Sequence, residues 1–190
     1  MIRTFIALEL KDKETIEKIN EFGKILRQNQ ANIKLVELHN LHLTVKFLGN
    51  IKEDLAPKIY KIIQKEINEP LFHDKSLKYQ LIGAGHFKNY AVIWIGLKGD
   101  INFLQNVKDL VENKLNEQLK IPRDKRTQFK PHLTIGRLKS NKINYKNFNN
   151  FKKIITEYRD FEFGPFTMKG LKLKKSQLTP KGPIYTDLEY

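Results

Sequence analysis

Apolar and polar residues follow two rhythms along the chain, and these rhythms predict a mixture of strands and helices. Short apolar or alternating runs are typical of strands. We assign such runs to residues 4–10, 34–37, 42–48, 77–84, 90–97, 129–138, 163–174 and 184–188, with a hairpin loop at 85–89. Apolar residues spaced three or four apart indicate amphipathic helices. These cover residues 16–26, 54–67, 99–119 and 145–158, so helices and strands interleave along the chain.

Two of the strands carry the same short pattern of a histidine and a threonine two residues apart. The first reads His42-Leu43-Thr44-Val45 and the second reads His132-Leu133-Thr134-Ile135. On an extended strand the histidine and threonine share one face, while the aliphatic residues take the other. Each pattern therefore offers an imidazole and a hydroxyl on one side and a core-forming surface on the other.

The two patterns lie 90 residues apart, and each is preceded by one helix and followed by another. This spacing suggests a duplicated α/β unit. Pairing the two units about a pseudo-twofold axis would place both histidines and both threonines in one groove. A single His-x-Thr triplet arises easily by chance and would indicate only an ordinary strand face. Its repetition among five histidines favours a functional site.

Length and composition limit the class of protein. A chain of 190 residues without a linker or low-complexity segment fits one domain, 1–190, or two small lobes that share a core. Its 40% hydrophobic residues predict a globular core. The absence of cysteine excludes a disulfide framework, a thiolate metal site and a cysteine nucleophile. With no signal peptide and no apolar run of membrane-spanning length, we expect a cytoplasmic protein that does not bind membranes.

The formal charge of +14 favours polyanionic partners, and RNA is the first candidate. The alternative is that most of the lysines simply solvate the surface. The charge is nevertheless concentrated in two segments, 120–130 just before the second motif and 169–181 near the end of the chain.

Two imidazoles and two hydroxyls without a carboxylate cluster suit the cleavage of a phosphodiester. With an ordinary pKa of about 6.5, one imidazole accepts a proton from water while the other donates one to the leaving oxygen. Threonine hydroxyls can donate hydrogen bonds to the non-bridging phosphate oxygens. Because the motifs supply no third protein ligand for zinc, we expect no metal and no other cofactor.

Longer stretches around both motifs resemble the 2H phosphoesterase superfamily, and within it the RNA 2′,3′-cyclic phosphodiesterase branch, historically named 2′-5′ RNA ligase. The stretches that carry the resemblance run from His42 to Gly49 and from Pro131 to Arg137. Further matches are Arg3-Thr4-Phe5-Ile6-Ala7, Asn40-Leu41, Trp94-Ile95-Gly96, Ser176-Gln177-Leu178 and Tyr185. Val45 and Ile135 replace the usual leucine, and Gly136 replaces a common alanine, which leaves the polar residues unchanged.

The resemblance implies a bilobal α+β fold, with two pseudo-twofold-related lobes whose antiparallel sheets are flanked by helices around a central basic cleft. It also implies catalytic roles. His42 would donate a proton to the leaving 3′ oxygen, His132 would accept one from water, and the product would be a 2′-phosphate end. The sequence pattern itself is symmetric and leaves the choice of acid and base open.

Four further residues are candidates for binding substrate. Arg137 matches a phosphate-contacting arginine of the superfamily, and we expect Gly136 to permit a bulge or a local twist that redirects its side chain toward His132; the alternative is a surface arginine at a strand end. By strand alternation Lys46 shares a face with His42, so it is a candidate for contacting a phosphate. The alternative is a solvated lysine at a strand end. Phe47 or Phe129 is a candidate for stacking on a base, although such residues usually belong to a core. Tyr185 is a candidate cleft hydroxyl. The three histidines outside the motifs, His39, His73 and His86, are expected to lie on the surface.

The main functional hypothesis is metal-independent hydrolysis of RNA 2′,3′-cyclic phosphate ends to 2′-phosphate ends, by a monomer whose substrates include tRNA fragments. One alternative is a 2′-5′ RNA ligase that joins tRNA half-molecules, with a 5′-hydroxyl in place of water. ATP-driven ligation is not expected, because neither a phosphate-binding Gly-rich Lys-Ser/Thr loop nor a Lys-x-Asp-Gly motif is present. The other alternative is a non-catalytic RNA-binding module.

Overall fold

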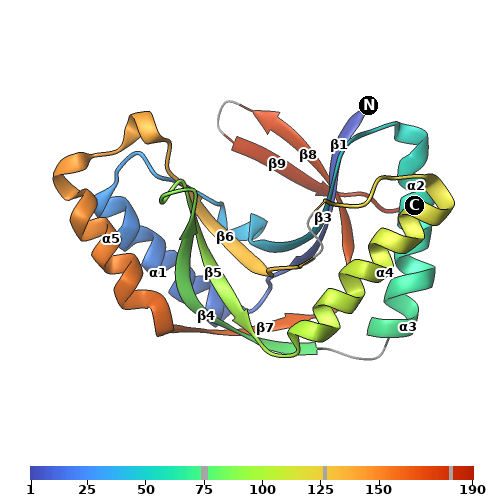
Figure 1. Ribbon diagram of the computed structural model, residues 1–190, viewed down its shortest axis with the longest axis horizontal. Helices are drawn as coiled ribbons and strands as arrows, with labels where there is room; N and C mark the ends of the chain where they lie inside the picture. The colour runs from blue at the N-terminus through green and yellow to red at the C-terminus, as the bar shows by residue number, and fades with distance from the viewer. Residues whose placement is uncertain (74–76, 126–127, 180–181) are drawn as a thin grey trace.

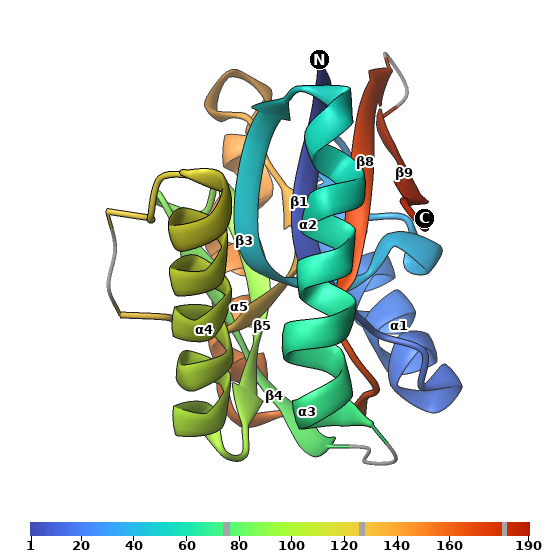
Figure 2. The same cartoon turned by 90° about the vertical axis from the view of Figure 1, so that its right-hand side faces the viewer.

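The computed structural model describes residues 1–73, 77–125, 128–179 and 182–190. Its strands are β1 (Ile2–Glu9), β2 (Lys34–Leu35), β3 (His42–Ile51), β4 (Leu77–Phe87), β5 (Val92–Lys98), β6 (His132–Arg137), β7 (Glu162–Met168), β8 (Lys172–Thr179) and β9 (Gly182–Asp187). Its α-helices are α1 (Lys13–Asn29), α2 (Ala56–Ile62), α3 (Glu69–Phe72), α4 (Ile101–Leu119) and α5 (Phe148–Glu157). A π-helical stretch, Ile63–Asn68, joins α2 to α3 into one long helix (Figure 2).

The strands form one curled antiparallel sheet in the order β7-β4-β5-β6-β3-β1-β8-β9, and β2 pairs with β6 (Figure 1). The two motif strands, β6 and β3, are neighbours at the centre, with three strands of this order on either side. Helices α1 and α5 cover one half of the sheet, and α2, α3 and α4 cover the other. The expected α+β fold of antiparallel strands flanked by helices is therefore confirmed, and the strands form one continuous sheet where separate sheets were expected.

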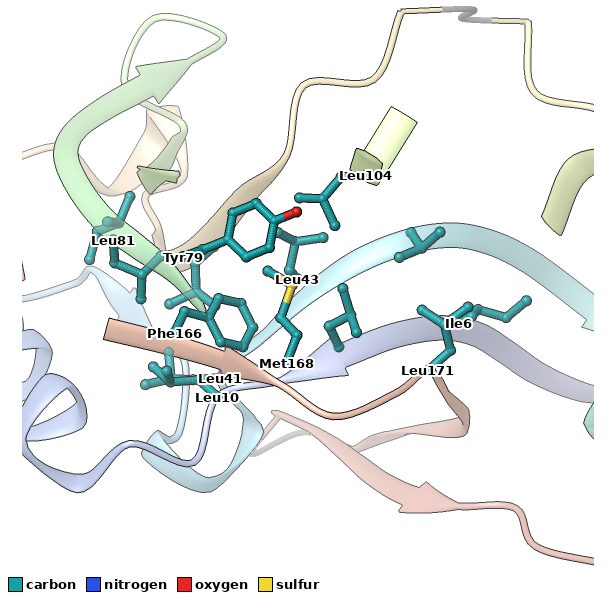
Figure 3. Close-up of a cluster of buried hydrophobic side chains, with 14 of the residues drawn as sticks. Ile6, Leu10, Leu41, Leu43, Tyr79, Leu81, Leu104, Phe166, Met168 and Leu171 are labelled. Atoms are coloured by element: carbon teal, nitrogen blue, oxygen red, sulfur yellow. The ribbon is translucent and has the colours of Figure 1, made fainter. Parts of the chain in front are cut away.

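One hydrophobic core runs under both halves. Leu43 and Leu133 are each 0% exposed and are paired with each other across the β3–β6 junction. Around Leu43 gather Leu104 from α4 and, from the other half, Tyr79 and Phe166 (Figure 3). The aliphatic residues of the motifs thus join the two halves by packing, which leaves the opposite face of the same strands for polar side chains.

Several element boundaries differ from those that periodicity predicts. Strand β4 continues through the expected loop to Phe87, and the turn that follows places Lys88, Asn89 and Tyr90 at positive φ. The expected strand 163–174 is two strands, β7 and β8, separated at Gly170, whose φ is +144°. Such left-handed backbone is uncommon for residues with a Cβ, and periodicity gives no signal for it.

Both motif strands contain the same β-bulge. In β3, Thr44 pairs with Ala7 while Lys46 pairs with Ile6, so Val45 is an extra residue. In β6 the same irregularity falls at Ile135, and Gly136 is buried while Arg137 is exposed. A bulge reverses the alternation of side chains beyond it. The expected bulge before Arg137 is therefore confirmed, and the matching bulge in β3 was not anticipated.

Because of the bulge in β3, Lys46 points away from the face that carries His42, which corrects the expectation that it contacts a phosphate from that face. Its side chain is 2% exposed. The Nζ atom donates to Glu112 Oε2 at 2.8 Å, to the Pro122 carbonyl oxygen at 3.0 Å and to Asp124 Oδ1 at 3.2 Å.

Lys46 belongs to a buried ionic cluster with Lys108, Glu112 and Asp124. Lys108 Nζ lies 2.9 Å from Glu112 Oε1 and 3.3 Å from Asp124 Oδ2. Burial alone would raise the pKa of Asp124, but the two lysines outweigh it and hold that pKa below its ordinary value. The cluster ties β3 and α4 to the start of the basic segment 120–130, which leads into β6.

Replacing Lys46 with methionine should destabilise the fold, because Glu112 and Asp124 would lose one of the two lysines that contact them within the described residues. We expect K46M to lower the free energy of unfolding by about 3 kcal/mol in urea titrations at pH 7. The deficit should shrink below about pH 4, since the contribution of a carboxylate with a depressed pKa is lost as it becomes protonated. The control is K65M, which removes the exposed Lys65–Glu69 pair and should cost about 0.5 kcal/mol. An equal loss in both variants would contradict this assignment.

Candidate active site

The two histidines and two threonines meet on one face of the β3–β6 junction. Leu43 and Leu133 are directly paired in an antiparallel register, so His42 and Thr44 flank the pair on one strand and His132 and Thr134 flank it on the other. All four polar side chains are half-buried, whereas the two leucines are fully buried on the helix-covered side. The predicted grouping of His42, Thr44, His132 and Thr134 therefore matches the geometry of the fold.

Each imidazole is held by the backbone two residues before it. His42 Nδ1 lies 2.6 Å from the Asn40 carbonyl oxygen, and His132 Nδ1 lies 2.8 Å from the Lys130 carbonyl oxygen. Because a carbonyl oxygen only accepts hydrogen bonds, Nδ1 must carry the proton in both rings. The Nε2 atom of each ring is thereby left to accept or donate a proton. The same local geometry is used twice.

Aromatic rings contact each histidine of the two motifs. The His42 ring lies 4.9 Å from the Phe5 ring and 5.3 Å from the Tyr185 ring, measured between centroids. The His132 ring lies 5.0 Å from the Phe87 ring and 6.3 Å from the Trp94 ring.

These contacts restrict the orientation of the imidazoles. Phe5 and Trp94 stand out in the sequence only as parts of the family resemblance. Phe87 gives no signal there, since it lies within the expected loop 85–89.

Several influences act on the pKa of His42, and burial is the largest of them. Burial lowers its pKa from the ordinary 6.5. The hydrogen bond to the Asn40 carbonyl and the charge of Glu9 oppose this shift, and the charge of Lys174 adds to it. Lys174 Nζ itself lies 2.5 Å from Glu9 Oε1 and 2.5 Å from Asp187 Oδ1. The net result is a histidine that favours its neutral form in the absence of a bound anion.

Tyr185 and Arg137 approach one another from opposite halves of the sheet. Burial raises the pKa of Tyr185, while the nearby guanidinium groups of Arg137 and Arg3 act to lower it. Tyr185 contacts the His42 ring edge-on, and the charge of Arg137 acts on the Tyr185 hydroxyl. The exposed Arg137 therefore lies on the same side of the sheet as the two imidazoles. The bulge in β6 thus has the expected effect. Arg3 was noted only as part of a family match, although it shares a strand face with Phe5.

The aromatic candidates for base stacking have different surroundings. Phe47 is 66% exposed, and its ring lies 6.3 Å from that of Phe5. Phe129 is half-buried against the core, and its backbone N–H donates to Gln105 Oε1 at 2.7 Å. Phe47 is therefore the ring that remains open to a ligand.

The other histidines, His39, His73 and His86, are exposed as expected. Basic side chains line the approach to β6, with Arg123, Lys125 and Lys130 all exposed. Arg126 and Lys181, which contribute to the two basic segments of the sequence, lie outside the described residues.

A cavity of about 640 Å³ lies elsewhere, between the α2–α3 helix and the segment that joins β7 to β8. It contains neither His42 nor His132, and lysines and carboxylates line it together. We do not assign the candidate active site to this cavity, because neither histidine motif lines it. Within the described ranges, no cluster of three or more His, Cys, Asp or Glu side chains could hold a metal ion, and no helix is long and apolar enough to cross a membrane.

Comparisons with known proteins agree with this geometry. A sequence profile described as "AKAP7 2'5' RNA ligase-like domain" matches residues 4–187. The RNA 2′,3′-cyclic phosphodiesterase of Methanocaldococcus jannaschii is 38% identical over 188 residues, which are 97% of this chain and 96% of that protein. The protein of the same name from Archaeoglobus fulgidus is 34% identical over 192 residues, which are 98% of each chain.

Solved structures give the same fold. TT0787 of Thermus thermophilus superposes with a TM-score of 0.73 at 26% identity, over 99% of this chain and 96% of that one. E. coli LigT complexed with phosphate superposes with a TM-score of 0.69 at 20% identity, over 99% of this chain and 95% of that one. With a profile match over nearly its full length and relatives above 30% identity, the chain belongs to the family of AKAP7 2'5' RNA ligase-like domains, within the 2H phosphoesterases.

Proposed function

We propose that this protein is an RNA 2′,3′-cyclic phosphodiesterase that hydrolyses cyclic phosphate ends to 2′-phosphate ends without a metal. The observation that carries the proposal is the pair of imidazoles on adjacent strands, each with Nδ1 bonded to a backbone carbonyl oxygen. Two such groups can act as general acid and general base. The printed names of the relatives from M. jannaschii and A. fulgidus support the same activity.

In the proposed reaction, Nε2 of His132 accepts a proton from water as the water oxygen attacks phosphorus. The P–O3′ bond breaks, and Nε2 of His42 donates a proton to the departing 3′ oxygen. The product carries a 2′-phosphate and a 3′-hydroxyl, and exchange with solvent restores both rings. The assignment of acid and base follows the family resemblance.

The remaining candidate residues have complementary tasks. Thr44 and Thr134 donate hydrogen bonds to non-bridging oxygens, whose charge grows in the transition state. Arg137 neutralises the phosphate, and Tyr185 supports the orientation of His42 through its edge contact. Phe47 stacks on a base, which requires no particular base identity.

Both halves of the chain contribute a histidine, so we propose that residues 1–190 act as a single bilobal domain and as a monomer. We propose RNAs with 2′,3′-cyclic phosphate ends as substrates, tRNA fragments among them. The excess of basic residues and the exposed cations before β6 suit such polyanions.

Replacing either histidine should abolish the reaction while the fold persists. We expect His42→Ala and His132→Ala each to lower kcat by about 10²–10⁴, the usual contribution of a general acid or base. Circular dichroism should match that of the wild type. His73→Ala, which removes an exposed histidine at the end of α3, should retain full activity. Wild-type turnover in either motif variant would exclude the mechanism.

The chemistry of the product separates hydrolysis from its alternatives. A short oligonucleotide with a 2′,3′-cyclic phosphate should yield a 2′-phosphate end, detected by end-group analysis, and EDTA should leave the rate unchanged. A 3′-phosphate product would reverse the assignment of the leaving oxygen. A joined product in the presence of excess 5′-hydroxyl ends would favour ligation, and no product would leave only RNA binding.

The pH dependence of kcat/KM tests the role of His42. An acid must be protonated, so kcat/KM should fall as pH rises through the pKa of His42, which lies below the ordinary 6.5. Because the charge of Glu9 raises that pKa, Glu9→Gln should move this alkaline limb to lower pH. Glu21→Gln, on the exposed face of α1, should leave it in place. A limb that instead increases with pH and shifts in Glu9→Gln would make His42 the base.

A further inference from the structure

One face of β1 carries a row of residues that starts beside His42 and extends away from it. In the register of β1 with β3, Glu9 pairs with His42, Ala7 with Thr44, Phe5 with Phe47 and Arg3 with Asn50. Directly paired residues share a face of the sheet. Arg3 therefore lies on the same face as the catalytic histidine, beyond Phe5 in the row.

Arg3 is an exposed guanidinium that no carboxylate neutralises within the described part of the chain. This contrasts with Lys174 in the neighbouring strand, whose ammonium group contacts both Glu9 and Asp187. The charge of Arg3 nevertheless reaches the candidate active site, because it acts on the Tyr185 hydroxyl together with Arg137. An exposed guanidinium beside that site is well suited to binding a phosphate.

Arg3 lies further along β1 than Phe5, away from the bond that breaks in the proposed reaction. Its Cα is two residues from that of Phe5, or about 7 Å along the strand, and the Phe5 ring already contacts His42. This step is on the scale of the distance between successive phosphates of an RNA strand. The exposed ring of Phe47 is paired with Phe5 and so lies between the level of His42 and that of Arg3. An aromatic ring followed by a cation matches the order of a base and the next phosphate.

We propose that Arg3 binds the phosphate on the 5′ side of the terminal nucleotide, so that the enzyme prefers the end of an RNA chain to a free nucleoside 2′,3′-cyclic phosphate. This inference rests on the proposed function and specifies its substrate class. Arg137 and the two motifs hold the cyclic phosphate, and Arg3 holds its upstream neighbour. A nucleoside cyclic phosphate has no group for Arg3 to bind.

Two matched substrates test the assignment: adenosine 2′,3′-cyclic phosphate, and the dinucleotide ApA with a 2′,3′-cyclic phosphate end. For Arg3→Gln, the ratio of kcat/KM for the dinucleotide to kcat/KM for the nucleoside should fall about ten-fold, as expected for the loss of one charge-assisted contact. The salt dependence of kcat/KM for the dinucleotide should weaken by about 0.7 in log–log slope. Arg3→Lys should retain part of the preference.

The matched control is Arg27→Gln, which removes the same charge from the exposed last turn of α1 and should keep the wild-type ratio. An unchanged ratio in Arg3→Gln, or an equal loss on both substrates, would overturn the proposal.

Product binding separates this inference from the proposed function. If the wild type cleaves neither substrate, the hydrolase assignment fails. Calorimetry with adenosine 2′-phosphate and with ApA ending in a 2′-phosphate then still tests Arg3. Arg3→Gln should weaken binding of the dinucleotide selectively, and equal effects on both ligands would refute the role of Arg3.

Discussion

The pairing of β3 with β6 is the constraint on which the site depends. Each strand is the innermost member of its own half of the sheet, and the two meet through the pair Leu43 and Leu133. The burial of these leucines brings His42 and His132 onto one face from positions 90 residues apart. No disulfide is available to fix this geometry, because the chain has no cysteine. Hydrophobic packing and a short ladder of hydrogen bonds therefore align the two histidines.

The two halves share the same bulged strand conformation at their motifs and differ in the residues that follow the bulge. Both strands place a histidine, a leucine and a threonine, and both then bulge at a β-branched residue. Beyond the bulge, one half has Lys46 in a buried ionic cluster, whereas the other has Gly136 packed against Ile33 and Leu35. The next residue is an aromatic ring in one half and a guanidinium in the other. The surroundings of the two histidines thus differ, although the motifs themselves are nearly symmetric.

Local patterns in the sequence predicted the parts of the molecule that local rules determine. Strand alternation placed His42 and Thr44 on one face, and helical spacing located α4. The burial of Lys46 could not be predicted in this way. It depends on a bulge in the register with β1 and on partners 66 and 78 residues away in the sequence. The ring contacts of Phe5 and Phe87 likewise arise only when distant strands come together. The turn after Phe87 has Lys88, Asn89 and Tyr90 at positive φ, and because none of them is glycine, the sequence does not indicate this conformation.

The position of β1 has a consequence for synthesis on the ribosome. This strand precedes the other strands of the sheet along the chain, yet it lies inside the sheet, and its second neighbour is β8, at residues 172–179. Five consecutive residues, Thr4 to Leu8, are buried in the finished protein. The nascent chain must therefore carry an apolar strand with one open edge until β8 has been translated. Such long-range closure slows folding and exposes the strand to wrong partners, so we expect chaperone holding of the nascent chain to matter for its yield.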